Sequence, residues 1–427
     1  MDFHVIICLV IFVLATVSFC LNKLTMGTTA MLATLAFVLT GCLDASKAVS
    51  FFGNTSAILV MAMAIVSAGF SRTQFVDKLA HGIGSLAKGN LTRICFGYVC
   101  LAALLSQFVS SPTTVFCIIA PLVGATVDGL DLSRSKIMFP VGITCIVTCG
   151  TLPMGAGISQ VAKINTFLEA AGLDYVCELT DMTRVRLPLM IAVIIYCSFI
   201  APHFCPAQPE TAIVAATKVK KKEPLPPLQE KCSLIIFFAC TIALIFAKQI
   251  GIPVYIIAMT AAMLMVLTGV LKPKEATAAI PLWLYFLIVG SMAISAALVD
   301  TGAGSLIGGV IADFGRSLNS EFLLYLLFFM APFLVTQVMQ NNATIPVFLP
   351  IVIEACTALN VSPIGPCIVV YAGVLGSIMT PMATATVSQY MGEGGYSLGT
   401  TVKMSIIPSI MFAVVTVVSA MIAFPLY

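Results

Sequence analysis

An apolar sequence that repeats itself is the feature that most restricts the fold of this chain. The Val-Leu-Thr-Gly motif at residues 38–41 returns about 228 residues later, at 266–269. Farther along, a polar cluster at 106–114 has a counterpart at 336–344, and each cluster interrupts an otherwise apolar run. In a membrane chain, duplication with interrupted segments at matching places is typical of a transporter binding site.

Composition restricts the class of protein further. Hydrophobic residues make up 60% of the 427 residues and charged residues only 9%, whereas soluble domains carry about 25% charged residues. The net charge of +3 is small and dispersed, which argues against a nucleic-acid partner. The 15 cysteines show no zinc or disulfide spacing, so we interpret them as buried apolar side chains. These features predict an all-α polytopic protein of the lipid bilayer.

Eight apolar runs are candidates for membrane-spanning helices, which need about 20 residues. They cover residues 3–21, 26–43, 56–70, 187–200, 233–250, 253–271, 280–298 and 404–424. The first run has no basic region before it and no cleavage site after it. We therefore interpret it as a retained span rather than a signal peptide.

Four further regions are apolar but interrupted by polar residues, Gly and Pro. Residues 91–127 and 321–359 are each too long for one span and are broken near their middles, so we interpret both as re-entrant hairpins. Residues 135–168 and 363–391 are interpreted as discontinuous spans.

This arrangement gives each half five crossings and one re-entrant hairpin, which totals about ten spanning helices and two hairpins. Because five is odd, the second half enters the membrane upside down, and the chain is predicted to be an inverted repeat. We expect the first repeat at 1–202 (scaffold spans in 1–89, hairpin and broken span in 90–202), the linker at 203–231, and the second repeat at 232–427 (scaffold spans in 232–319, hairpin and broken span in 320–427).

The positive charges predict the orientation. With both termini outside the cytoplasm, 15 of the 21 Lys and Arg residues fall on the cytoplasmic side, as the positive-inside rule requires. The other six, which include Arg184 and Arg186, fall outside. We therefore predict a multi-pass protein of the inner or plasma membrane, with extracytoplasmic termini and a cytoplasmic loop at 203–231.

Interrupted helices indicate where the chemistry lies. Unpaired backbone groups cannot face lipid, so broken helices at membrane depth must line protein or a wet cavity. Carbonyl and hydroxyl oxygens suit a hard cation such as Na⁺, and helix N-termini suit an anion. Two related halves then predict two cation sites on either side of one central anion. Isolated residues such as Ser67 are interpreted as helix contacts instead.

Two ionisable residues have two open interpretations each. Lys163, in the first broken span, either neutralises an anion from a distance or extends to the membrane interface. Glu354, in the second hairpin, either belongs to a functional site or faces the interface. Because no carboxylate pair falls inside the apolar segments, cation-coupled anion uptake is favoured over a proton-relay exchanger.

On these residues, the chain resembles the divalent anion/sodium symporters of the ion transporter superfamily, citrate transporter-like permeases that carry di- and tricarboxylates. The resemblance covers nearly the whole chain. It rests on the segment 67–80, on the Ser-x-Phe-x-Ser run at 106–110 and on the Thr-Pro-x-Ala-Thr break at 380–384.

The hairpin tips depart from the pattern of that family. Its Ser-Asn-Thr signature falls on residues 110–112 and 340–342, where only Ser110 and Asn341 keep the expected residue type. The amide side chains of the second tip fit a hydroxylated or larger anion.

The resemblance implies a secondary active transporter with an elevator mechanism, in which hairpins and broken spans slide against a scaffold that forms a homodimer. The coupling ion would be Na⁺ and the substrate a small organic anion. The first cation site would use Ser106, Ser110, Ser111 and the carbonyl near Gly155. The second would use Thr336, the carbonyl of Met339, Asn341 and the carbonyl near Ala383. The anion would lie among Ser110, Ser111, Ala156, Asn341, Asn342 and Thr384.

Two alternatives stay open at this stage. A permease of the same superfamily for another solute, such as an inorganic oxyanion, a sulfonate, or a cation exchanged for protons, would have the same helix pattern. A membrane-embedded enzyme would need a nucleophile–base pair or a metal set at membrane depth. The sequence shows neither, so we expect no enzyme activity, no catalytic residues and no cofactor.

Overall fold

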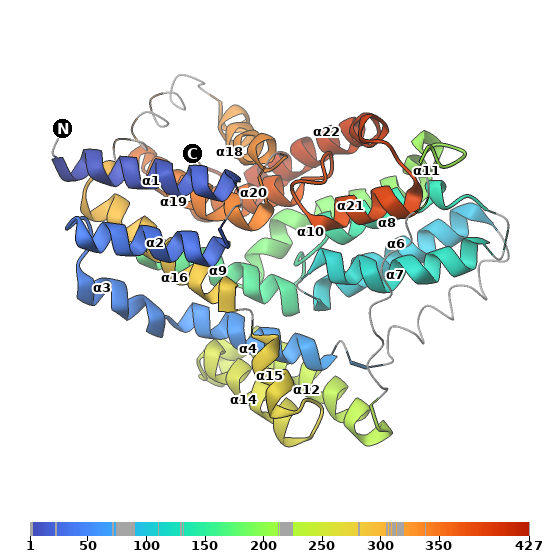
Figure 1. The fold of residues 1–427 in the computed structure, drawn as a ribbon, viewed down its shortest axis with the longest axis horizontal. Helices are drawn as coiled ribbons and strands as arrows, with labels where there is room; N and C mark the ends of the chain where they lie inside the picture. The colour runs from blue at the N-terminus through green and yellow to red at the C-terminus, as the bar shows by residue number, and fades with distance from the viewer. Residues whose placement is uncertain are drawn as a thin grey trace.

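Helices form all the regular structure in the part of the chain that the computed structural model describes (Figure 1). That part comprises residues 3–21, 24–70, 72–73, 90–109, 111–128, 130, 132–211, 213, 225–280, 282–304, 306, 309, 313, 320–337 and 339–426. The predicted all-α class is confirmed there.

The helices follow the expected runs closely. The first half holds α1 (Phe3–Leu21), α2 (Met26–Leu39), α3 (Ala45–Ser50), α4 (Thr55–Phe70), α6 (Leu91–Phe108), α7 (Pro112–Asp128), α8 (Met138–Val147), α9 (Gly155–Ala170), α10 (Asp181–Ile195) and α11 (Ala201–Phe204). The second half holds α12 (Pro227–Ile245), α13 (Ala247–Ile250), α14 (Val254–Leu267), α15 (Pro273–Ala279), α16 (Leu282–Asp300), α18 (Glu321–Thr336), α19 (Asn341–Leu359), α20 (Ile364–Leu375), α21 (Ala385–Gly394) and α22 (Leu398–Ala423).

Six helices among the described residues are long and apolar enough to cross a membrane by length and composition. They are Ala45–Phe70, Leu91–Phe108, Asp181–Phe204, Pro227–Leu244, Asn341–Leu359 and Leu398–Ala423. Several shorter apolar helices, such as α14 and α20, accompany them. The re-entrant course of the hairpins and the total of ten crossings stay predictions.

The repeated Val-Leu-Thr-Gly motif ends the same helix in each half. Thr40 follows α2 and Thr268 follows α14, and each hydroxyl donates to the carbonyl four residues earlier at 2.7 Å. Gly41 and Gly269 come next with φ of 73° and 74°, the left-handed conformation that favours glycine after a helix. The chain then forms one short helix, α3 or α15, before the long helix that follows.

The two halves pack against each other reciprocally. Helix α2 lies against α16, and α4 lies against α14. Lys47 pairs with Asp300 at 2.8 Å, and Arg72 pairs with Glu275 at 2.8 Å. Glu275 occupies the position of Lys47 in the repeat, about 228 residues later, and Asp300 occupies that of Arg72. The same contact therefore occurs twice with its charges reversed, as two repeats related by a twofold axis require.

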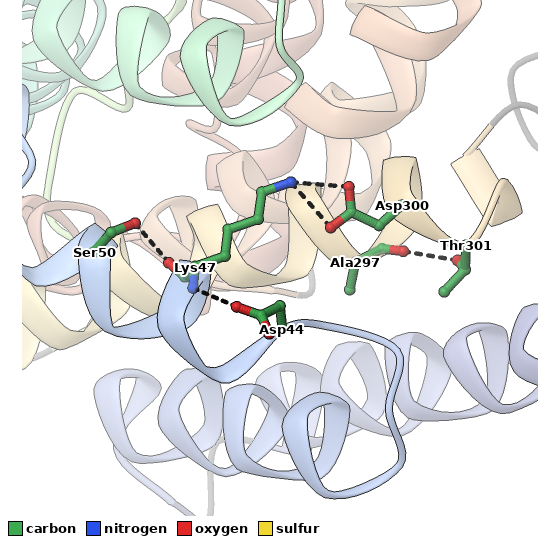
Figure 2. A network of polar contacts seen from close by, with 6 residues as sticks. All are labelled: Asp44, Lys47, Ser50, Ala297, Asp300 and Thr301. Atoms are coloured by element: carbon green, nitrogen blue, oxygen red, sulfur yellow. Dashed lines mark hydrogen bonds and ion pairs between the residues drawn. The ribbon is translucent and has the colours of Figure 1, made fainter.

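Figure 2 shows the first of these contacts in detail. Asp44 caps α3 by accepting the main-chain N–H of Lys47 at 3.1 Å. The hydroxyl of Ser46 and this N–H lower the pKa of the Asp44 carboxyl. The cap fixes the start of α3, and the ammonium of Lys47 reaches both carboxylate oxygens of Asp300, at 2.8 and 2.9 Å. The orientation of the implied twofold axis relative to the membrane stays a prediction.

The hairpins pack against the broken spans. Helices α6 and α7 pack against α8, and α7 also packs against α21 of the other half, as Figure 1 shows on the side opposite α1. Helices α18 and α19 pack against α20, and α19 also contacts α9. Each hairpin thus contacts the broken spans of both halves.

The reciprocal ion pairs differ in burial, which gives a test. The side chains of Arg72 and Glu275 are 16% and 27% exposed, whereas those of Lys47 and Asp300 are 42% and 36% exposed. Arg72 also donates to the carbonyl of Val270 at 3.0 Å. We expect Arg72→Met to lower the free energy of unfolding by about 2 kcal/mol and Lys47→Met by about 0.5 kcal/mol. Thermal unfolding of the detergent-purified protein, followed by circular dichroism, measures both. An equal or larger loss in Lys47→Met would contradict this ranking.

Candidate functional site

The first hairpin meets the first helix break through a close backbone approach. Helix α6 ends at Phe108, and α9 begins at Gly155 after the break. A Cβ atom on Gly155 would lie 2.4 Å from the carbonyl oxygen of Phe108, which is main chain. Only glycine permits this contact, so Gly155 holds the end of the hairpin helix against the start of α9.

A buried glutamine closes the first break. The side-chain amide of Gln107 donates to the carbonyl of Thr148 at 2.9 Å, and its oxygen accepts the main-chain N–H of Leu152 at 2.9 Å. Both backbone groups belong to the interruption between α8 and α9, where the helix supplies no partner. Gln107 therefore supplies the hydrogen bonds that the interrupted helix has lost.

Gln337 has part of this role in the second half. Its oxygen accepts the N–H of Met379 in the break at 3.3 Å, whereas its amide donates to the carbonyl of Phe333 within α18 at 2.9 Å. The hydroxyl of Thr380 donates to the carbonyl of Gln337. The prediction of the site omitted both glutamines, although each lies in a polar cluster, directly after Ser106 or Thr336.

Oxygen atoms converge at the second hairpin tip. The hydroxyls of Thr336 and Ser377 both donate to the side-chain oxygen of Asn341, each at 2.7 Å. The hydroxyl of Thr336 lies 3.4 Å from the carbonyl oxygen of Met339, and the N–H of Asn341 donates to the carbonyl of Ala383 at 3.1 Å. The four residues expected at the second cation site are thus brought together, with Ser377 as a fifth that the sequence did not indicate.

We call Thr336, Met339, Asn341 and Ser377 the oxygen cluster. It contributes two hydroxyl oxygens, one amide oxygen and one carbonyl oxygen, all uncharged. Such a set suits a hard monovalent cation, because the oxygen dipoles replace its hydration shell without adding a formal negative charge. The hydroxyl protons can rotate away when a cation approaches the oxygens. Among the described residues there is no group of His, Cys, Asp and Glu that would hold a transition metal instead.

The residues expected at the first cation site use their polar atoms otherwise. The hydroxyl of Ser106, which is fully buried, donates to the carbonyl of Cys145 at 3.3 Å. The hydroxyl oxygen of Ser111 accepts the N–H of Thr114 at 3.3 Å. The carbonyl of Gly155 accepts the hydroxyl of Ser159 at 3.2 Å. Ser110 lies outside the described residues, so the first site stays a prediction.

Threonines link the first hairpin to the second broken span. The hydroxyl of Thr113 on α7 lies 3.0 Å from that of Thr386 on α21. Thr384, expected at the anion, caps α21 and lies 3.3 Å from Thr386. The N-terminus of α21 therefore lies near both hairpins, since Asn341 binds the adjacent carbonyl of Ala383.

Asn342 and Lys163 line one pocket. It lies between α9, α16 and α19 and has free space of about 20 Å³ for the centres of water molecules, enough for about one water. Ser291 completes its polar lining, and the rest is apolar, including Phe167 and Ile345. Lys163 makes no ion pair with any residue that the structure describes, and both interpretations of this residue stay open.

The positions of Ala156 and Glu354 say less about the function. Ala156 is buried in the first turn of α9. Glu354 lies on α19, where a Cβ atom on Gly304 would come within 2.8 Å of its carboxyl carbon. Glu354 therefore packs against the chain that follows α16, and the oxygen cluster lies at the opposite end of α19.

The citrate transporter family profile matches residues 9–250 and 241–427 of this chain. The chain belongs to the citrate transporter family. It is accordingly a multi-pass membrane protein of a transporter family, as the sequence predicted, and nothing in this family indicates catalytic activity.

Individual relatives are also named as transporters. An uncharacterized transporter of Haemophilus influenzae is 24% identical over 410 residues, 91% of this chain and 85% of that protein. An uncharacterized transporter of Synechocystis is 31% identical over 179 residues, 42% of this chain and 29% of that protein. Sodium/sulfate cotransporter 2 of Chlamydomonas reinhardtii is 27% identical over 135 residues, 32% of this chain and 15% of that protein. This chain thus matches less than a third of the length of the last two.

Solved structures share the fold. The YdaH transporter of Alcanivorax borkumensis superposes with a TM-score of 0.60 at 15% identity, covering 90% of this chain and 91% of that one. MtrF of Neisseria gonorrhoeae superposes with a TM-score of 0.58 at 14% identity, covering 99% and 95%. At these identities the likeness concerns the fold alone.

The close backbone approach at Gly155 predicts a large loss of thermal stability when one methyl group is added there. Gly155→Ala should lower thermal stability markedly, because a main-chain carbonyl 2.4 Å from the new Cβ cannot rotate away. Gly399→Ala is the matched control, since Gly399 begins α22 with no atom within 4 Å of an added Cβ. Its melting temperature should stay the same or rise, because alanine is the better helix former. Equal melting temperatures for the two variants would refute the close contact.

Proposed function

We propose that this protein is a secondary transporter that carries a small organic anion, such as a di- or tricarboxylate, across the membrane together with Na⁺. The oxygen cluster is the observation that supports this proposal. Uncharged oxygens from a hairpin tip and a helix break offer a cation site without a permanent charge. Such a site binds its ion reversibly, as a coupling ion requires.

The anion would bind beside this cation. Asn341 and Asn342 occupy the first turn of α19, where main-chain N–H groups point out of the helix. Thr384 and the N-terminus of α21 lie next to them. A cation in the oxygen cluster and the ammonium of Lys163 would add positive charge on either side of Asn342. Anion and cation then stabilise each other, so neither binds well alone, and this mutual dependence is the basis of coupling.

An elevator movement fits the position of the pocket. Helices α9 and α19 belong to the predicted moving unit, whereas α16 belongs to the predicted scaffold. The pocket that contains Lys163 and Asn342 lies between them. A sliding of one unit against the other would change the side from which this pocket is open. A homodimer formed through the scaffold, with extracytoplasmic termini, completes the proposal.

Sulfate is the second candidate substrate. Three relatives that match this chain over about a third of its length are named sodium/sulfate cotransporters or a probable one. Sulfate and the dicarboxylates share the chemistry of a divalent oxyanion, so one uptake assay distinguishes them.

Uptake into proteoliposomes tests the proposal. Labelled citrate, succinate and sulfate are each offered with an inward Na⁺ gradient or with choline instead. We expect at least one of them to accumulate in a Na⁺-dependent manner. Absence of uptake of all three under Na⁺, choline and proton gradients would refute the proposal.

Substitutions of the two neighbouring asparagines should affect cation binding and anion binding differently. Asn341→Ala removes the central oxygen of the cluster, so we expect the Na⁺ concentration for half-maximal uptake to rise at least tenfold. Asn342→Ala should instead raise the KM for the anion. Asn360→Gly is the control, because Asn360 follows the far end of α19 in a left-handed conformation that glycine also adopts. If Asn341→Ala and Asn342→Ala retain the Na⁺ and anion dependence of the wild type, this assignment of the site is wrong.

A further inference from the structure

Equivalent glutamines close the two helix breaks. Gln107 accepts the N–H of Leu152, and Gln337 accepts the N–H of Met379. The Pro-Met pair at 153–154 returns at 381–382, so Leu152 directly precedes its proline, whereas Met379 lies two residues before its own. The two glutamines therefore bond to neighbouring positions of the repeated break.

A second pair of hydrogen bonds connects each break to a later helix of the same half. Thr183 on α10 donates to the carbonyl of Thr151 at 2.8 Å, and Ser405 on α22 donates to the carbonyl of Ile378 at 3.0 Å. Helices α10 and α22 thus occupy corresponding places beside the two breaks.

Among the described residues of the first half, the hydroxyls expected at a cation site do not converge as those of the oxygen cluster do. The hydroxyl of Ser106 donates to the carbonyl of Cys145, and that of Ser111 accepts the N–H of Thr114. In the second half, the hydroxyls of Thr336 and Ser377 instead meet at the side-chain oxygen of Asn341.

A guanidinium group lies at the first break instead. Arg186 donates to the carbonyl of Val147 at 2.8 Å, to the side-chain oxygen of Gln160 at 2.9 Å and to the carbonyl of Gly150 at 3.4 Å. Its side chain is 1% exposed, and it forms no ion pair with any residue in the described ranges. Oxygen atoms of the first break thus coordinate a permanent positive charge.

The helices around the second break differ in charge. Helices α18 to α22 contain one basic residue, Lys403, and it is exposed. Within the described residues, no buried basic side chain of these helices therefore lies at the second break, where the oxygen cluster occurs.

A buried cation without a counter-ion has an energetic cost that a bound anion relieves. Carbonyl oxygens accept hydrogen bonds from Nη1 and Nη2 of Arg186, whereas its buried Nε–H has no hydrogen-bond partner among the described residues. These bonds leave the charge of the guanidinium uncompensated. A guanidinium cannot lose its proton in a protein, so the charge is permanent. An anion held at the nearby hairpin tips would therefore be attracted by Arg186 in every transport cycle.

From this asymmetry we propose that Arg186 acts as a built-in cation that replaces the exchangeable cation of the first half. Transport then couples to one Na⁺, bound at the oxygen cluster of the second half, and not to two. The inference rests on the proposed function, because it specifies how many cations accompany the anion. Arg186 is a positioning residue for charge and need not touch the substrate.

Wild-type stoichiometry is the direct test. Proteoliposomes receive ²²Na⁺ together with ³⁵S-sulfate, or with ¹⁴C-succinate if sulfate is not transported. We expect a flux ratio near one and a Hill coefficient for Na⁺ near one. One Na⁺ with a divalent anion moves one net negative charge inward, so a potential that is positive inside, set by K⁺ and valinomycin, should accelerate uptake.

Substitutions of two arginines on α10 separate the effect of the Arg186 charge from a structural effect. Arg186→Gln keeps donors for the break carbonyls but removes the charge, so we expect the KM for the divalent anion to rise about tenfold while the Hill coefficient stays near one. Arg186→Lys should restore most of the affinity. Arg184→Gln is the matched control, because Arg184 lies on α10 with a side chain 64% exposed, and its KM should equal that of the wild type.

The outcomes distinguish this inference from the proposed function. A flux ratio of two, electroneutral uptake, uptake without Na⁺ dependence, or an unchanged KM in Arg186→Gln would each overturn the built-in cation while leaving anion transport intact. If Arg186→Gln does not fold, the ratio of Na⁺ flux to anion flux in the wild type and the response of its uptake to the membrane potential still test the inference. No uptake of either anion would instead reject the proposed function.

Discussion

The architecture of the site depends on two glutamine side chains that repair interrupted helices. A helix that breaks inside an apolar protein leaves N–H and C=O groups without partners, and each such group costs free energy when buried. Gln107 and Gln337 supply these partners from the adjacent hairpins. The interrupted backbone is thereby hydrogen-bonded although the helix is not continuous. Hairpin and break consequently act as one unit in each half.

Reciprocal contacts connect the two halves, which nevertheless differ around their helix breaks. Reciprocal pairs with reversed charge, Lys47–Asp300 and Arg72–Glu275, hold the outer helices together. Around the breaks the same backbone plan carries different side chains. One half offers uncharged oxygens around Asn341, whereas the other holds the guanidinium of Arg186. In the mechanism proposed above, the first of these positions binds a mobile charge and the second holds a fixed charge.

Much of the fold was predictable, because membrane-spanning helices are recognisable by their length and their apolar composition. The broken regions were also predictable, since polar clusters and Gly-Pro runs interrupt them. The second cation site was predicted through a family resemblance, and the structure brings its four residues together. Ser377 was missed because nothing in its local sequence distinguishes it from a helix contact. Arg186 was expected outside the membrane beside Arg184, because sequence alone does not show which of two arginines on one helix turns inward.

A high-resolution experimental structure of the protein in lipid nanodiscs with Na⁺, compared with one in choline, tests the central claim most directly. The account predicts a Na⁺-dependent density peak within coordination distance of Thr336, Asn341 and Ser377, with Gln337 still bonded to the break. Continuous dry helix through residues 375–385, or oxygens of this cluster that face lipid without any ion, would contradict it.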